Sequence, residues 1–119
     1  MSIAANELRI GNWVRFINKT FQVGPETIED CYKANITQSP YQYEPIPLSP
    51  SVLEACGFRY YDNDWYEKGE INVNITDGRI CITQKWQVFV NANINHLHQL
   101  QNLHFALTGQ ELIYNPPTK

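Results

Sequence analysis

The sequence has few cysteines, few positive charges and no long apolar run, and each shortage narrows the possible classes of function. Its three cysteines, Cys31, Cys56 and Cys81, lie far apart and form no Cys-x-x-Cys pair. Zinc sites and dithiol redox motifs need that close spacing, so neither is expected. We expect buried, reduced thiols, because a free cysteine packs as a small apolar side chain.

No run of eighteen apolar residues occurs, so no membrane-spanning helix is expected. The first residues lack the basic stretch and apolar core of a secretory signal, which predicts a cytoplasmic protein. The chain has nine Lys and Arg residues and twelve Asp and Glu residues, and no three basic residues are consecutive. Binding to nucleic acid is disfavoured, because it needs clustered positive charge.

Common catalytic motifs are also missing: a glycine-rich phosphate loop, a nucleophile elbow and a Ser/His/Asp arrangement. On a helix His96 and His104 would lie two turns apart, roughly 12 Å, which is too far to share one metal ion. We expect no catalytic residue, no metal and no cofactor. An enzyme ranks last among the functions considered, although the absence of a motif does not exclude one.

The length predicts one α+β domain over residues 1–119, with a flexible tail at 115–119. Alternating apolar residues from Leu8 to Phe16 predict an opening hairpin that Gly24-Pro25 interrupts. A small SH3-like barrel is the alternative for these first strands. Because of its prolines, the segment 31–48 is expected to be an extended, ordered arm.

The dipeptide Asp77-Gly78 is a strong signal for a two-residue hairpin turn. Taken literally, it aligns Thr76 with Arg79 and so fixes the register of both strands. The further pairs are Ile75 with Ile80, Asn74 with Cys81, Val73 with Ile82, Asn72 with Thr83 and Glu70 with Lys85. A second hairpin is expected around 62–64, and Trp86, Val88 and Val90 continue the alternation. Together these segments predict an antiparallel β-meander.

Two helices are expected to pack with this meander. The first spans residues 50–56, with Ser49 as N-cap, Pro50 at the first helical position and Gly57 after its end. The second is an amphipathic helix over 95–108, closed by Gly109. Residues 111–114 are expected to add a short last strand.

The segment 86–110, which includes the second helix, contains no Asp, Glu, Lys or Arg. One interpretation is a solvated face of uncharged amides. The other is an interface with a protein partner or a second copy of the chain, formed by His98, Asn102 and Phe105 on the outer helix face. Burying amides costs less than burying charges, which suits such an interface.

Aromatic residues make up 13% of the chain and include a cluster beside the turn at 62–64. Packing into the core is the simpler interpretation. A ligand-binding surface is the alternative, with Tyr60, Trp65 and Trp86 stacking on a base or nucleotide and Arg59 or Arg79 binding its charge.

Three blocks carry a resemblance to a known family: LRIGNWV at 8–14, EPIPLSP at 44–50 and LHQLQNLHFALTGQEL at 97–112. The chain resembles a family of uncharacterised small proteins of gut bacteroidal bacteria and their phages and mobile elements. The resemblance implies a phage or mobile-element setting and assigns no functional residue. The leading hypothesis is a non-catalytic binding module that acts through the helix, a sheet edge or self-association. A protein that sequesters a small ligand or nucleotide is the alternative.

Overall fold

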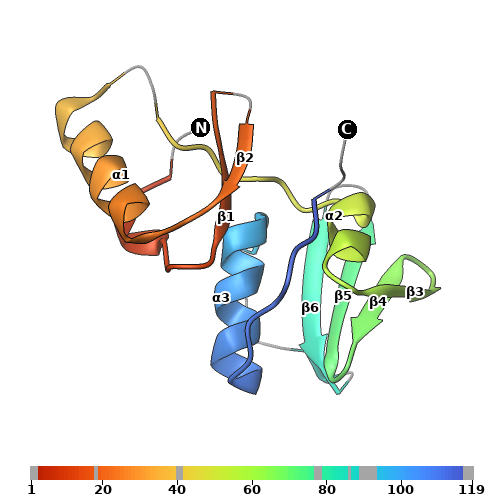
Figure 1. Cartoon of the computed structure of the whole chain (residues 1–119). Coiled ribbons are helices and arrows are strands. Elements are labelled where there is room, and N and C mark those ends of the chain that lie inside the picture. The colour runs from red at the N-terminus through yellow and green to blue at the C-terminus, as the bar shows by residue number, and fades with distance from the viewer. Residues whose placement is uncertain are drawn as a thin grey trace. The chain divides into compact units, whose positions relative to one another are not determined.

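A computed structural model of the chain describes residues 3–17, 19–39, 42–76, 79–85, 87–88 and 94–116. The chain divides into two compact units. Unit 1 comprises residues 1–47 and 96–111, and unit 2 comprises residues 48–95 and 112–119. The architecture is α+β, as predicted, with helices, a two-stranded sheet and a five-stranded antiparallel meander (Figure 1).

Unit 1 begins with a short 3-10 helix, η1 (Ala5–Glu7), followed by a hairpin of β1 (Trp13–Phe16) and β2 (Lys19–Gln22). The hairpin is predicted correctly, with Val14 opposite Phe21, but the first strand is shorter than expected because Gly11 turns the chain at φ 99°. In the described residues these strands form an open two-stranded sheet and do not close into an SH3-like barrel. A helix follows β2 where a barrel would continue with a third strand.

That helix, α1 (Pro25–Thr37), is the largest error of the sequence-based prediction, which placed an extended arm from residue 31. Gly24-Pro25 ends the strand as predicted, since β2 stops at Gln22, and Pro25 then starts the helix, because proline at the first helical position sacrifices no hydrogen bond. Thr27 Oγ1 accepts a hydrogen bond from the Gly24 N–H at 3.2 Å and so caps the first turn. Of the helix side chains, only Cys31 is fully buried, which explains why no clear apolar stripe marks α1 in the sequence.

The extended arm exists over a shorter span, residues 42–49. Arg15 of β1 and Glu44 of the arm exchange two backbone hydrogen bonds, at 2.9 and 2.7 Å. The Tyr43 ring lies 4.5 Å from the Phe16 ring centre and 5.6 Å from that of Phe21. The core of unit 1 is formed by Ile3, Leu8, Val14, Val23, Cys31 and Tyr43.

The C-terminal helix, α3 (Leu97–Thr108), belongs to unit 1 and begins two residues later than expected. The Leu97 N–H donates to the Ile46 carbonyl at 2.8 Å, which ties the helix start to the arm. Gly109 ends the helix at φ 74°, where its N–H donates to the Phe105 carbonyl at 2.8 Å. Leu97 and Leu100 of the predicted leucine stripe are completely buried.

Unit 2 contains the meander in the order β3 (Arg59–Asp62), β4 (Trp65–Lys68), β5 (Ile71–Thr76), β6 (Arg79–Gln84) and β7 (Gln87–Val88). The register derived from the Asp77-Gly78 signal is confirmed at every predicted strand pair, from Thr76 with Arg79 to Asn72 with Thr83. Lys85 Nζ lies 3.6 Å from Glu70 Oε1, as expected. Asp77, Gly78, Trp86 and Val90 lie outside the described residues.

The short helix α2 (Pro50–Ala55) follows its sequence signals closely. Ser49 Oγ accepts a hydrogen bond from the Val52 N–H at 3.3 Å. At the other end, the Phe58 N–H donates to the Leu53 carbonyl at 3.0 Å, and Gly57 has φ 90°. This is the Schellman arrangement, and it places Leu53 and Phe58 in the core of unit 2.

Residues 111–116 lie in no strand, so the predicted last strand is wrong. Leu112 and Tyr114 are nevertheless buried, and the Asn115 N–H donates to the Ala55 carbonyl at 2.9 Å. Asn115 is therefore anchored, contrary to the expectation of a flexible tail, while 117–119 lie outside the described residues. In the part of the chain that is described, no helix has the length and apolar character needed to cross a membrane.

Candidate functional site

The polar side chains of α3 meet the segment of residues 7–13, here called the N-terminal strap. Gln101 is almost completely buried and makes two hydrogen bonds to the backbone of the strap. Its Oε1 accepts from the Trp13 N–H at 2.8 Å, and its Nε2 donates to the Gly11 carbonyl at 3.2 Å. A neutral amide thus supplies both a donor and an acceptor where a charged side chain would supply one of them.

Asn12 of the strap and Asn102 of α3 form the next layer of this contact. Asn12 is fully buried, and its Nδ2 donates to Asn102 Oδ1 at 2.9 Å. The Asn102 amide also donates to the Glu7 carbonyl at 3.0 Å. Asn12 Oδ1 accepts from the Arg9 N–H at 2.7 Å, which holds the bend of the strap. The uncharged residues of α3 therefore pair largely with this chain's own strap.

Arg9 forms the solvent-exposed part of the contact between the strap and α3. Its guanidinium carbon lies 4.6 Å from the ring centre of Phe105, and its Nη1 donates to Glu111 Oε2 at 2.7 Å. Its Nε donates to Asn102 Oδ1 at 2.9 Å. The planar guanidinium combines stacking with directed hydrogen bonds, which a lysine ammonium could not reproduce.

His98 and Glu7 form a partly buried pair. His98 is 1% exposed, and its Nε2 lies 3.1 Å from Glu7 Oε1. Because a carboxylate only accepts, Nε2 carries the proton of a neutral imidazole and donates it. Burial lowers the pKa of His98, the hydrogen bond and charge of Glu7 oppose this shift, and the nearby His96 lowers the pKa further. His98 Nδ1 is buried and has no hydrogen-bond partner in the described structure.

These contacts correct the predicted interface of His98, Asn102 and Phe105. His98 does not project from an outer face: it is buried, and its Nε2 lies beside the Glu7 carboxylate. Asn102 is half-buried and takes part in three internal hydrogen bonds. Phe105 alone is exposed, at 41%, and Arg9 covers one side of its ring.

The three histidines make contacts within the chain. His104 is buried, and its Nδ1–H donates to the Gln110 carbonyl at 2.9 Å just beyond the helix end. The rings of His96 and His98 are stacked, with centres 6.1 Å apart. Within the described ranges, no group of three or more His, Cys, Asp or Glu side chains could hold a metal ion.

The residues of the predicted ligand surface do not converge. In the meander, Arg59 of β3 pairs with Glu67 of β4. Glu67 pairs with Asn72 of β5, and Asn72 pairs with Thr83 of β6. Arg79 lies four residues before Thr83 in β6, about 13 Å away at the usual rise of a strand. Arg59 instead donates to Glu67 Oε1 at 3.2 Å, and Trp65 is half-buried. Trp86 lies outside the described residues.

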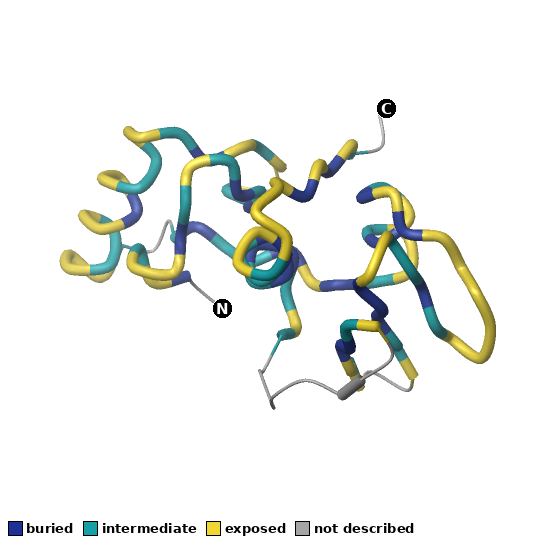
Figure 2. Tube along the Cα trace, turned by 90° about the horizontal axis from the view of Figure 1, so that it is seen from below, coloured by how far each residue is buried: buried dark blue, intermediate teal, exposed yellow. Residues whose placement is uncertain are grey.

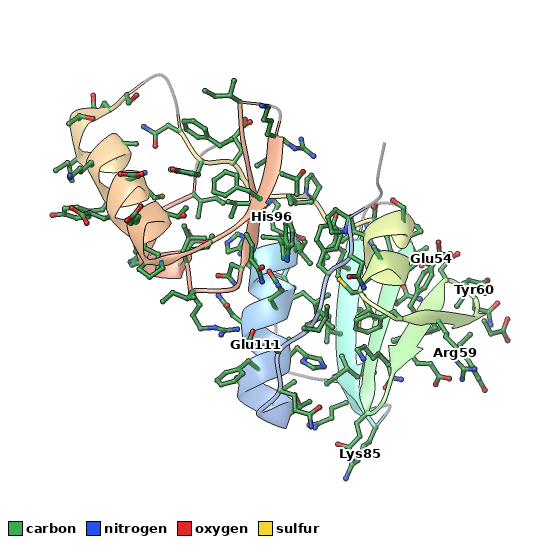
Figure 3. All side chains as sticks on the ribbon, viewed as in Figure 1. Glu54, Arg59, Tyr60, Lys85, His96 and Glu111 are labelled. Carbon is green, nitrogen blue, oxygen red and sulfur yellow. The ribbon has the colours of Figure 1, made fainter. Side chains whose placement is uncertain are left out.

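Tyr60 is also part of the predicted ligand surface, and it lies on the free edge of the meander. β3 has β4 as its one neighbour among the described strands, and all four of its residues are exposed (Figure 2). Tyr60 is 56% and Tyr61 is 61% exposed. Arg59 and Tyr60 leave opposite sides of the strand (Figure 3). Tyr61 belongs to the same aromatic cluster and lies where the register of β3 against β4 shifts, between Tyr60 and Asp62.

The thiols follow the prediction in part. Cys31 and Cys56 are buried, and burial raises the pKa of both, that of Cys56 to about 12. The charge of Glu7 adds to the shift at Cys31. Cys81, on the polar face of β6, is exposed, so the expectation of three buried thiols is wrong.

Comparisons with protein-family models, curated proteins and solved structures found no match for this chain.

Proposed function

We propose that the protein is a non-catalytic interaction module that binds an extended segment of a partner protein along the edge strand β3. The observation that carries this proposal is the exposure of all four β3 residues, two of them tyrosines, at a free sheet edge. An edge strand offers unpaired backbone groups to which an extended segment can add as a further strand. Tyrosine is among the residues that contribute most to binding energy at protein interfaces.

The side chain of Tyr60 is already held in place by its neighbours, which favours its use in binding. The Tyr60 ring packs edge-on against Tyr66, with ring centres 5.4 Å apart, and Tyr66 itself is buried. The Tyr60 hydroxyl also accepts a hydrogen bond from the Asp64 N–H at 3.4 Å. A side chain already held in place loses less conformational freedom on binding than a free one. The irregular register between Tyr60 and Asp62 limits the strand available to a partner to a short stretch.

The protein-partner proposal is preferred over nucleotide sequestration. A nucleotide would need an arginine beside the stacking rings, but Arg59 leaves the opposite side of β3 from Tyr60 (Figure 3), and Arg79 lies on β6, three strands from β3 in the sheet order. Arg59 is also engaged with Glu67 at 3.2 Å. A phage or mobile-element setting and a cytoplasmic location belong to the same proposal. The setting rests on the resemblance of the three sequence blocks, and the location rests on the sequence.

Selection of a displayed random-peptide library on the immobilised full chain tests the proposal. We expect enriched peptides rich in apolar and β-branched residues, and we expect Tyr60→Ser and Tyr61→Ser to abolish their binding. Tyr32→Ser is the matched control, because Tyr32 is 57% exposed on α1 in unit 1. Enriched peptides that bind both β3 variants as tightly as the natural chain would refute the proposal, as would a selection that enriches none.

A further inference from the structure

Unit 1 contains an open hollow of about 530 Å³ near η1 and the C-terminal end of α1. Its lining residues are Ala4, Glu7, Asn35, Gln38, Ser39 and Gln42. The volume is within the range of small-molecule sites. This hollow is independent of the β3 edge, which belongs to unit 2.

Two amide side chains give the hollow a fixed wall. Asn35 donates to the Ile3 carbonyl at 3.2 Å and to Gln42 Oε1 at 2.9 Å, and its Oδ1 accepts from the Ala5 N–H at 2.9 Å. Gln42 Nε2 donates to the Ala34 carbonyl at 2.7 Å and to the Ser39 carbonyl at 2.8 Å. Both amides are thus held in place before any ligand arrives, which lowers the cost of binding.

Among the described residues that line the hollow, Glu7 is the one that is ionisable. Its side chain is 47% exposed, and one oxygen, Oε1, accepts from His98. Among the described residues, no group donates to Oε2 of Glu7 or bonds to the side-chain amide of Gln38. These two groups are available to a ligand in the hollow.

The state of His98 decides the charge at this site. His98 is a neutral imidazole at neutral pH because its burial disfavours the charged form. A neutral donor orients the Glu7 carboxylate and leaves its negative charge in place. His96 is a second titratable group close to His98, and no Lys or Arg is found among the described residues that line the hollow.

We infer that this hollow binds a small organic cation carrying a primary amine or a guanidinium group, anchored by Glu7. The cation donates to Glu7 Oε2, and the Gln38 amide contacts the remainder of the ligand at the rim. Hydrogen bonds between ionised groups are about twice as strong as those between neutral groups, so the carboxylate selects a cation over a polar neutral molecule. A phosphate or nucleotide would meet this carboxylate without any compensating positive charge.

Isothermal titration of the full chain with putrescine and with agmatine at low ionic strength tests this inference. The uncharged 1,4-butanediol serves as the ligand control. Glu7→Gln keeps the acceptor for His98 and removes the charge, and we expect it to weaken binding about tenfold or more. Glu54→Gln removes the same charge at an exposed position of α2 in unit 2, and we expect it to leave binding unchanged.

Gln38→Ala provides a second variant if Glu7→Gln fails to fold, and we expect it to weaken binding by about two- to tenfold. Circular dichroism establishes folding for each variant. The inference is overturned if neither amine binds saturably, if butanediol binds as well as putrescine, or if Glu54→Gln weakens binding as much as Glu7→Gln. Failure here leaves the β3 proposal intact, because the peptide selection tests residues of the other unit.

Discussion

The Arg9 guanidinium stacks on the ring of Phe105, with its central carbon 4.6 Å from the ring centre, and joins the N-terminal strap to α3. Beneath this pair, Asn12, Gln101 and Asn102 form a layer of neutral hydrogen-bonding groups. The absence of charge from α3 therefore has an explanation within the chain. Its amides pair with backbone and side-chain groups of the strap, where an unpaired buried charge would be costly.

Replacing Arg9 by Lys is expected to destabilise unit 1 by about 1 kcal/mol, because lysine keeps the charge but loses the stacked, forked geometry. Denaturant unfolding followed by circular dichroism measures the change. Lys33→Ala is the control: it removes an exposed pair with Glu29 at 3.2 Å, and its expected cost is below about 0.5 kcal/mol. Equal costs for the two variants would contradict the role given to Arg9.

The stability of the protein should depend on pH through His98. Burial lowers the pKa of His98 in the folded chain below its ordinary value of 6.5, so the unfolded chain binds more protons between the two values. Stability should therefore be complete above about pH 6.5 and fall as the pH decreases below it, by at most about 1.4 kcal/mol per pH unit.

Unfolding measurements between pH 5.5 and 7.5 on the natural chain and on His98→Gln test this dependence. We expect the variant to show a shallower decrease, because glutamine can still donate to Glu7 but does not titrate. If the two proteins lose stability in parallel, His98 is not the responsible group.

The three thiols should react with iodoacetamide at very different rates at pH 8. Cys81 is exposed and is expected to be labelled first. Cys31 and Cys56 are buried, and their raised pKa values leave little thiolate to react. Intact mass and peptide mapping should find one label on the native chain and three after unfolding. Early labelling of Cys31 or Cys56 would show that the described burial is wrong.

The cap of α2 provides a test within unit 2. Ser49→Ala removes the acceptor for the Val52 N–H and is expected to cost about 1 kcal/mol. Ser51→Ala leaves that hydrogen bond in place and should change stability by less than about 0.5 kcal/mol. Thermal unfolding of both variants gives the comparison, and an equal loss would argue against the capping role of Ser49.

The sequence predicted features that depend on local chemistry. The dipeptide Asp77-Gly78 predicted the register of β5 and β6, and Ser49 and Gly57 marked the ends of α2. It did not reveal α1, because only one side chain of this helix, Cys31, is fully buried and no clear apolar stripe marks it. Whether a proline starts or interrupts an element depends on the packing of the residues after it, and composition alone does not show that packing.

The candidate sites were less accessible to sequence reasoning. The sequence shows that α3 carries no charge. It does not show that the strap covers α3, because this contact brings together residues about ninety positions apart. Glu7 was not considered beside His98 for the same reason. The aromatic ring of Tyr60 is visible in the sequence, whereas its place on an edge strand depends on the order of all the strands of the meander. Long-range pairing, unlike a turn or a cap, leaves no local signal.

A proton–nitrogen NMR titration of the full chain with a selected peptide tests the central claim most directly. We predict that the largest shift changes occur in the amides of residues 59–62 of β3 and of their partners in β4. The amides of α3, residues 97–108, should remain unchanged. Changes concentrated in α3, with β3 unaffected, would contradict the account and would return the charge-free helix to the role of a partner interface.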